Sequence, residues 1–328
     1  MRRIAKWLAA IAGLWALAAF ALNTNALAPT TPGPPLLLAH RGLAQTFHRE
    51  GLTNETCTAT RIHVPEHAYL ENTLASMRAA FDAGAAIVEF DIHPTTDGHF
   101  AVFHDWTLDC RTNGKGVTRD HTLTELKSLD LGFGYTADGG KTYPFRGQGV
   151  GLMPSLDDVL AAFPEQRLLI NVKSNDASEG ERLAEALRGL PPERLARLAA
   201  YGGDAPMAAL RDRIAIKTMS RASLKSCALR YLGFGWSGVV PSACRSTIML
   251  LPVNYAPMFW GWPNRFLARM QDAGTDVYVT GPLTGGDLGT SGIDDAETLH
   301  RLPAGFSGGI WTNRIDRIAP LVASRPGS

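Results

Sequence analysis

Short apolar runs alternate with helix-like stretches along most of this chain. The runs at 36–40, 86–92 and 167–173 are apolar enough for strands buried on both faces, as in a parallel sheet. The other expected strands are 195–201, 214–219, 248–255, 276–281 and 309–312, with a hairpin arm at 99–104. The spacing predicts helices over 71–84, 122–131, 155–163, 179–190 and 265–273. About eight strands separated by helices favour one α/β domain, a single (β/α)8 TIM barrel.

The first 35 residues differ from the rest. A basic start, MRRIAK, precedes an apolar run over 7–22 and a small-residue site that ends at Ala28. This is typical of an export signal cleaved after Ala28, with an uncleaved membrane anchor as the open alternative. We therefore assign 1–28 to the signal, 29–35 to an extended linker and 36–322 to the barrel domain. The domain is expected to be exported, periplasmic or secreted, or else anchored to a membrane by this segment.

The overall charge excludes one class of partner. The 328 residues carry a formal net charge of +1, so no global field favours nucleic acid or membranes. With 45% hydrophobic residues, the chain can bury one large core. We expect a small-molecule substrate, no nucleic acid and no protein partner. Contact with a membrane surface remains open.

Four cysteines fit an oxidising compartment. An even number in an exported chain is compatible with two disulfides, and the sequence allows three connectivities. Proximity along the chain favours Cys57–Cys110 and Cys227–Cys244. The alternative is four unpaired thiols.

Polar residues recur where the first three expected barrel strands end. They are His40 and Arg41, then Glu89 and Asp91, then Asn171 and Lys173. Catalytic groups of (β/α)8 barrels lie at the carboxyl ends of the strands. These three pairs are therefore expected to meet on one rim.

The types of these residues suggest phosphate chemistry. Glu89 and Asp91 share one face of a strand, where two buried carboxylates need neutralising. Mg²⁺ or Ca²⁺ would do this, and an ion pair to Lys173 or Arg41 is the alternative. The Arg41 fork suits phosphate oxygens, with Lys173 as a second charge. His40 and His104 are candidates for the acid and the base of a phosphoryl transfer between oxygens.

These residues form an ordered set of motifs. They are AHRG (39–42), LENT (70–73), VEFDIHPTTDG (88–98), AVFHD (101–105), MPSLDDVL (153–160) and INVK (170–173). With them the chain resembles the glycerophosphodiester phosphodiesterase family over roughly 36–175. The resemblance implies a (β/α)8 barrel that hydrolyses glycerophosphodiesters to glycerol 3-phosphate and an alcohol.

The resemblance also implies roles for single residues. His40 and His104 correspond to the acid/base pair, and Glu71 to an active-site glutamate. Arg41 corresponds to a phosphate ligand, while Glu89 and Asp91 correspond to metal ligands. In the family a glycerol hydroxyl attacks phosphorus first, and water then opens the cyclic phosphate.

Two features depart from the family pattern. Asn171 stands where the family has a third carboxylate ligand, so a metal would be held with less charge. The segment 42–71 is longer than usual and is expected to cover or narrow the site. A Cys57–Cys110 bridge would tie it to the region after His104.

An aromatic loop follows the expected strand 248–255. Phe259, Trp260 and Trp262 can either contact a choline headgroup or lipid surface, or pack on the ring of helices. One rival function is a phospholipase D-like activity on lysophospholipids or sphingomyelin. The other is non-catalytic binding of a phosphodiester or headgroup, with Asn171 marking a degraded metal site.

Overall fold

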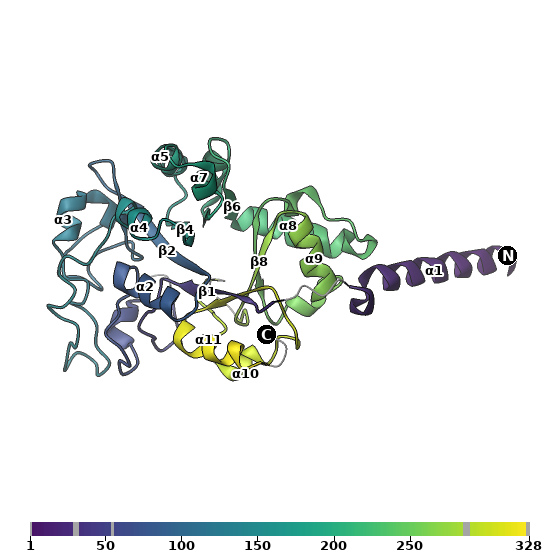
Figure 1. Cartoon of the computed structure of the whole chain (residues 1–328), viewed down its shortest axis with the longest axis horizontal. Helices are drawn as coiled ribbons and strands as arrows, with labels where there is room; N and C mark the ends of the chain where they lie inside the picture. Colours follow the sequence, from purple (N-terminus) through teal and green to yellow (C-terminus); the bar gives the residue numbers. More distant parts are fainter. Residues whose placement is uncertain (1, 29–32, 54–55, 285–288, 326–328) are drawn as a thin grey trace.

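The computed structural model describes residues 2–28, 33–53, 56–284 and 289–325. Within these residues, parallel strands form a nearly closed barrel wrapped by helices (Figure 1). The strands are β1 (Leu36–His40), β2 (Ile87–Pro94), β3 (Phe100–Val102), β4 (Arg167–Val172), β5 (Leu198–Gly202), β6 (Lys217–Ser220), β7 (Ile248–Pro252), β8 (Asp276–Thr280) and β9 (Gly309–Thr312).

The strand order is β6-β5-β4-β2-β1-β9-β8-β7, and β3 pairs antiparallel with β2. A parallel bridge between Thr218 and Thr247 joins the two ends of this order. The Thr247 hydroxyl strengthens the joint by donating to the Thr218 carbonyl at 2.7 Å. The predicted (β/α)8 barrel is therefore confirmed, and β3 is the predicted hairpin arm.

The helices follow the strands around the outside of the barrel. They are α1 (Arg2–Asn23), α2 (Leu74–Asp82), α3 (Leu123–Lys127), α4 (Leu156–Ala162), α5 (Ala177–Leu187), α6 (Pro192–Leu195), α7 (Asp204–Arg211), α8 (Arg221–Phe234), α9 (Asn264–Asp272), α10 (Ala296–Leu299) and α11 (Ile315–Ala323).

Several predicted boundaries were wrong by three or four residues, and two of them have a clear local cause. The helix expected from residue 71 begins at Leu74, because Thr73 and Ser76 form a capping box that fixes its start. The strand expected from residue 195 begins at Leu198, because a proline-initiated turn of helix, α6, occupies Pro192–Leu195.

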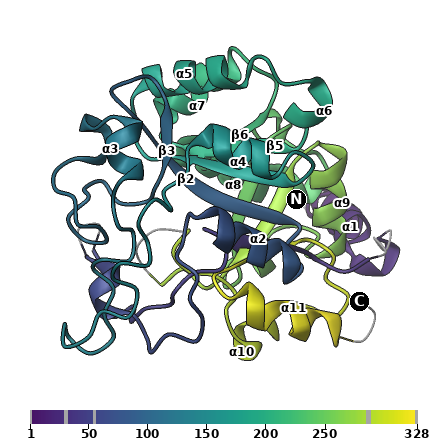
Figure 2. The ribbon, with the colours of Figure 1, turned by 60° about the vertical axis from the view of Figure 1, so that its left-hand side comes forward.

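The long segment after β1 packs on the loops that follow β3, not on the barrel alone (Figure 2). Buried side chains from both segments form a second apolar cluster, which includes Ala59, Ile62, Leu70, Leu108, Leu126 and Phe145. The disulfide Cys57–Cys110 links the two segments, and Cys227–Cys244 joins α8 to the turn before β7. Both favoured pairings are confirmed.

The N-terminal segment forms the helix α1, which projects from the barrel (Figure 1). The expected signal includes Met1, and the expected linker 29–35 includes 29–32. These five residues lie outside the described part of the chain.

Candidate active site

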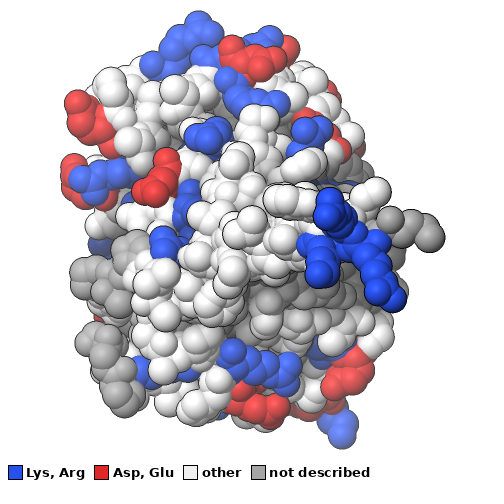
Figure 3. All heavy atoms as spheres, turned by 90° about the vertical axis from the view of Figure 1, so that its right-hand side faces the viewer, with Lys and Arg blue, Asp and Glu red and all other residues white. Residues whose placement is uncertain are grey.

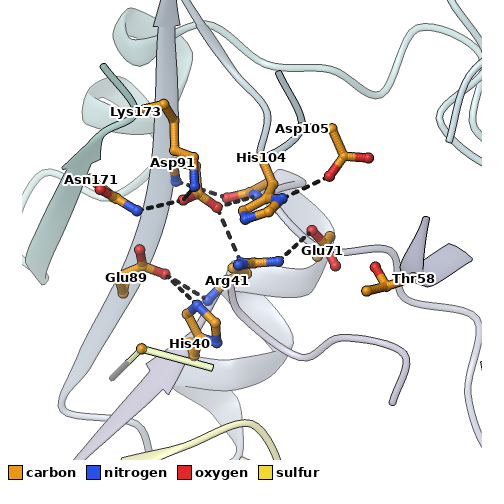
Figure 4. Close-up of polar contacts among 12 residues, drawn as sticks. His40, Arg41, Thr58, Glu71, Glu89, Asp91, His104, Asp105, Asn171 and Lys173 are labelled. Atoms are coloured by element: carbon orange, nitrogen blue, oxygen red, sulfur yellow. Dashed lines mark hydrogen bonds and ion pairs between the residues drawn. The ribbon is translucent and has the colours of Figure 1, made fainter. Parts of the chain in front are cut away.

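The end of β1 turns sharply to present Arg41. This residue has a left-handed backbone with φ of 59°, and Gly42 follows at 78°. A Cβ on Gly42 would lie 2.6 Å from the Ser76 hydroxyl, so the turn needs glycine. The turn directs the guanidinium into two ion pairs, with Asp91 and Glu71, both at 3.2 Å (Figure 4).

Asp91 on β2 is fully buried and surrounded by donors. The Asn171 amide donates to it at 2.8 Å, and the Lys173 ammonium lies 3.5 Å away. Burial alone would raise the pKa of Asp91, but Lys173 and Arg41 outweigh it and hold this pKa well below its usual range. The ion-pair alternative for this carboxylate is therefore present in the structure.

Glu89, two residues earlier, is equally buried but has weaker partners. It accepts hydrogen bonds from the Tyr201 hydroxyl at 2.7 Å and from the Arg41 backbone at 3.1 Å. Burial and the neighbouring Asp91 charge raise the pKa of Glu89 to about 8. Glu89 is thus the carboxylate of the site that most lacks a compensating charge.

The polar residues of the LENT motif (70–73) hold Arg41, Asp91 and helix α2 in position. Glu71 bridges Arg41 and Arg111, with Nη1 of Arg111 3.1 Å from its second oxygen. Asn72, with φ of 58°, donates to the Asp91 carboxylate at 3.0 Å and accepts from the Asp91 backbone at 3.1 Å. Thr73 then caps α2. Each polar residue of the motif has a separate structural task.

The two histidines have different partners. His40 Nδ1 donates to the amide oxygen of Asn313 at 2.6 Å, and Asp294 fixes that amide by accepting from its nitrogen at 2.9 Å. His104 Nδ1 donates to the carboxylate of Asp105 at 2.7 Å. Burial and the charge of Arg41 lower the pKa of both imidazoles, that of His40 well below its ordinary value. Both are therefore neutral at neutral pH in the free site, with Nε2 as acceptor.

Sequence reasoning missed the group that supports His104. Arg111 donates to Asp105 at 2.8 Å, to the Tyr135 hydroxyl at 2.7 Å and to the Thr58 hydroxyl at 2.6 Å. Arg111 and Thr58 directly follow the two bridged cysteines. The expected Cys57–Cys110 bridge was therefore a signal that Thr58 and Arg111 lie close together. The sequence around Arg111 gave no sign that its side chain turns inward.

Most predicted site residues do come together. Figure 4 shows His40 and His104 on the two sides of the Arg41 guanidinium, with the other predicted polar residues around them. The residues brought together are His40, Arg41, Glu71, Glu89, Asp91, His104, Asn171 and Lys173.

The aromatic loop lies elsewhere. Phe259 is buried and makes ring contacts with Tyr231 of α8 and Phe266 of α9. Trp262 packs on Phe266, and the Trp260 indole donates to a carbonyl of α8. The alternative of packing on the ring of helices therefore describes Phe259 and Trp262, whereas Trp260 also stays partly exposed.

Comparison with known proteins identifies the family. Residues 40–231 match the model of the glycerophosphoryl diester phosphodiesterase family. Glycerophosphodiester phosphodiesterases of Caldanaerobacter subterraneus and Bacillus subtilis are each 38% identical to this chain, over 103 and 133 residues. These matches cover 31% and 38% of this chain and only 39% and 42% of the two relatives.

Solved structures support the fold over a larger part of the chain. A glycerophosphoryl diester phosphodiesterase domain from Mycobacterium tuberculosis has a TM-score of 0.62 at 14% identity, covering 88% of this chain and 99% of that one. A glycerophosphodiester phosphodiesterase from Agrobacterium tumefaciens has a TM-score of 0.55 at 20% identity, with the same coverages. Since the family model spans more than half of the sequence, the chain belongs to the glycerophosphoryl diester phosphodiesterase family.

Proposed function

We propose that the protein hydrolyses glycerophosphodiesters to glycerol 3-phosphate and an alcohol. The observation that carries the proposal is the position of His40 and His104 on the two sides of Arg41 (Figure 4). A phosphodiesterase of Oleispira antarctica with this fold, 19% identical and with a TM-score of 0.53, has been solved with the product sn-glycerol-3-phosphate. The names of the curated relatives support the same reaction.

The hydrogen-bond partners of the two histidines favour His40 as the general base and His104 as the general acid of the first step. His40 Nε2 takes the proton of a glycerol hydroxyl as that oxygen bonds to phosphorus. Binding of the anionic phosphodiester favours uptake of a proton by His104, and Asp105 stabilises the resulting imidazolium. His104 then gives its Nε2 proton to the alcohol oxygen as the bond between that oxygen and phosphorus breaks. Water then opens the resulting cyclic phosphate, with His104 accepting the proton of water and His40 returning one to the ring oxygen. Arg41 and Lys173 would bind the phosphate oxygens.

Incubation of the full chain with glycerophosphocholine tests the reaction. We expect release of glycerol 3-phosphate and choline in equal amounts, measured by enzymatic assays for each product. Release of phosphocholine and glycerol instead would mean that the other phosphorus–oxygen bond is cleaved. No release from glycerophosphocholine or glycerophosphoethanolamine would contradict the proposed function.

The charges of the site favour a divalent cation. When Glu89 is ionised, four carboxylates, Glu71, Glu89, Asp91 and Asp105, meet three permanent cations, Arg41, Arg111 and Lys173. A phosphodiester would add a further negative charge to this excess. Among the described residues no group of three or more His, Cys, Asp or Glu side chains is arranged to hold a metal ion. Any metal must therefore use an amide or substrate oxygen as well.

We propose that Glu89, Asp91 and the amide oxygen of Asn171 hold Mg²⁺ or Ca²⁺. When bound, the ion would neutralise charge on the phosphate oxygens. Because Asn171 is neutral, we expect weaker binding than at a site with three carboxylates. In the structure the Asn171 amide nitrogen faces Asp91, so the amide would have to turn for its oxygen to reach the ion.

Replacing Glu89 tests the metal site through stability. The pKa of Glu89 is raised from 4.5 to about 8, so ionised Glu89 destabilises the folded state increasingly as pH rises between these values. We expect Glu89→Gln to stabilise the metal-free protein by about 2 kcal/mol at about pH 9, and to have no such effect at about pH 5. Thermal unfolding at both pH values measures this.

Added metal should reduce or reverse the difference in stability between Glu89→Gln and the native chain. Mg²⁺ or Ca²⁺ is expected to raise the Tm of the native chain and to leave that of Glu89→Gln unchanged. Glu297→Gln, at an exposed position of α10, is the matched control and should respond like the native chain. An equal response of all three proteins would refute the metal assignment.

Two disulfides and an apolar N-terminal helix are compatible with export or with a signal anchor. We propose that the barrel works in an oxidising compartment outside the cytoplasm. A thiol titration of protein recovered from the host's exported fraction should detect no free cysteine, whereas four free thiols would contradict this location.

A further inference from the structure

The helix α1 has the properties of a membrane span. Its 22 residues, Arg2–Asn23, make a rod of about 33 Å, close to the thickness of a bilayer core. Its large apolar side chains face solvent on all sides, with Trp7 72% and Phe20 70% exposed. Its basic residues, Arg2, Arg3 and Lys6, lie at the amino-terminal end. This asymmetry would leave the amino terminus in the cytoplasm and the barrel on the other side.

The residues at and just after the end of α1 are hydrogen-bonded to the barrel, which is not expected of a signal segment that is cleaved off. The side chain of Asn25 donates to the Trp262 carbonyl at 2.5 Å and accepts from the backbone of Asn264 and Arg265 at 3.1 and 3.3 Å. It thereby caps the first turn of α9. Cleavage after Ala28 would remove this cap.

A second set of contacts fixes the direction of α1. Arg269 of α9 donates to the Asn23 side chain at 2.9 Å and to the Leu22 carbonyl at 2.7 Å. The Asn23 amide also donates to the Trp236 carbonyl at 2.8 Å, and the Trp15 and Trp236 rings lie 5.2 Å apart. The loop after α8 therefore runs beside the second half of α1.

The barrel surface around this junction is apolar and basic. Its exposed apolar side chains, which we call the α8–α9 face, are Leu229, Phe234, Val239, Met258 and Trp260. Residues 213–271 include eight Lys or Arg and no Asp or Glu. Two of the eight, Arg213 and Lys217, pair with acids outside this stretch. Figure 3, which views the molecule from the side of α1, shows blue and white over the centre and red toward the edges.

We propose that α1 is retained as a membrane anchor and that the α8–α9 face rests on the outer surface of a bilayer that contains anionic lipid. Trp236 contacts Trp15 and Asn23 of α1. Phe234 and Val239, on either side of it along the chain, would enter the interface with it, where tryptophan is favoured. Arg230, Arg265 and Arg269 would then lie near the lipid headgroups.

This orientation turns the candidate active site away from the lipid. The loops 42–71 and 105–153, which leave the carboxyl ends of β1 and β3, lie on the left in Figures 1 and 2, and α1 lies on the right. The site would open to the aqueous compartment and receive soluble phosphodiesters. The anchor and its surface do not depend on the proposed hydrolysis, because none of their contacts involves the catalytic histidines.

The first test concerns retention of α1. The full chain is expressed in a bacterial host, and membrane and soluble fractions are compared by intact-mass measurement. We expect protein in the membrane fraction that resists an alkaline wash and still contains residues 2–28. Soluble protein that begins at Pro29 would overturn the proposal.

The second test measures lipid contact at single positions. Every cysteine is disulfide-bonded, so an added one can be labelled alone with an environment-sensitive fluorophore. Full-length Val239→Cys is reconstituted in phosphatidylcholine–phosphatidylglycerol vesicles and compared with Val64→Cys, whose native side chain is 80% exposed. We expect a blue shift and quenching by doxyl-labelled lipid at position 239, and neither at position 64.

The same samples distinguish lipid from a second copy of the chain. Equal emission at the two positions would overturn the proposal. So would crosslinking between copies through position 239 without quenching by lipid, because that result would assign the face to a dimer.

Discussion

Full-length protein carrying His104→Gln is expected to hydrolyse glycerophosphocholine about 10³-fold more slowly than the native chain, with little change in KM. The reason is that choline leaves as an alkoxide unless His104 protonates it, and Asp105 holds this imidazole in place. His40→Gln should lose a similar factor, because the attacking hydroxyl then keeps its proton. Product release under saturating substrate measures both effects.

The identity of the leaving group separates the two roles. Glycerophospho-p-nitrophenol releases an anion that needs no proton. In a single turnover, which reports only the release of p-nitrophenol, His104→Gln should therefore recover most of its rate on this substrate, whereas His40→Gln should not. His99→Gln, at an exposed position of the β2–β3 turn, is the control and should match the native chain on both substrates. Recovery by His40→Gln alone would reverse the assignment, and full activity of either variant on glycerophosphocholine would refute it.

Arg111→Met is expected to destabilise the protein by about 3–5 kcal/mol, the largest effect on folding that we predict. The buried guanidinium compensates Asp105 and Glu71 and donates to Thr58 and Tyr135. Its removal takes this partner from two carboxylates and two hydroxyls. Urea unfolding measures the loss, and Arg188→Met, at an exposed position, should change stability by less than about 0.5 kcal/mol.

A kinetic measurement shows whether Arg111 also positions the catalytic pair. In Arg111→Lys a charge remains, but the fork that links Asp105 to Tyr135 and Thr58 is lost. We expect kcat to fall while KM stays close to native. In a single turnover of glycerophospho-p-nitrophenol the rate of p-nitrophenol release should recover, because that step needs no proton donor. A purely structural role would lower the rate on both substrates by the same factor.

The barrel was predictable because its strands are short, apolar and regularly spaced, and β1 has the predicted bounds. Helix α8 was not predicted, since its apolar residues lie on more than one side. Leu224 and Tyr231 are buried, whereas Leu229 and Phe234 are exposed. Amphipathic periodicity cannot identify such a helix.

The rim residues were predictable for a different reason. In a parallel barrel, the carboxyl ends of strands meet whatever the loops do, so His40, Glu89 and Asn171 had to lie close together. Asn313 and Tyr201 obey the same rule and could have been found at the ends of later strands. Arg111 follows no such rule, because it reaches the site from a loop whose path depends on tertiary packing.

The bridge between Cys57 and Cys110 has a consequence for when the protein can begin to work. It joins the long segment after β1, which supplies Thr58, to the loop that carries Arg111. Arg111 donates to both Thr58 and Asp105. A newly made chain with reduced thiols lacks this covalent link. With the proposed export, oxidation of the two thiols outside the cytoplasm would complete the support of His104 only after the chain has crossed the membrane.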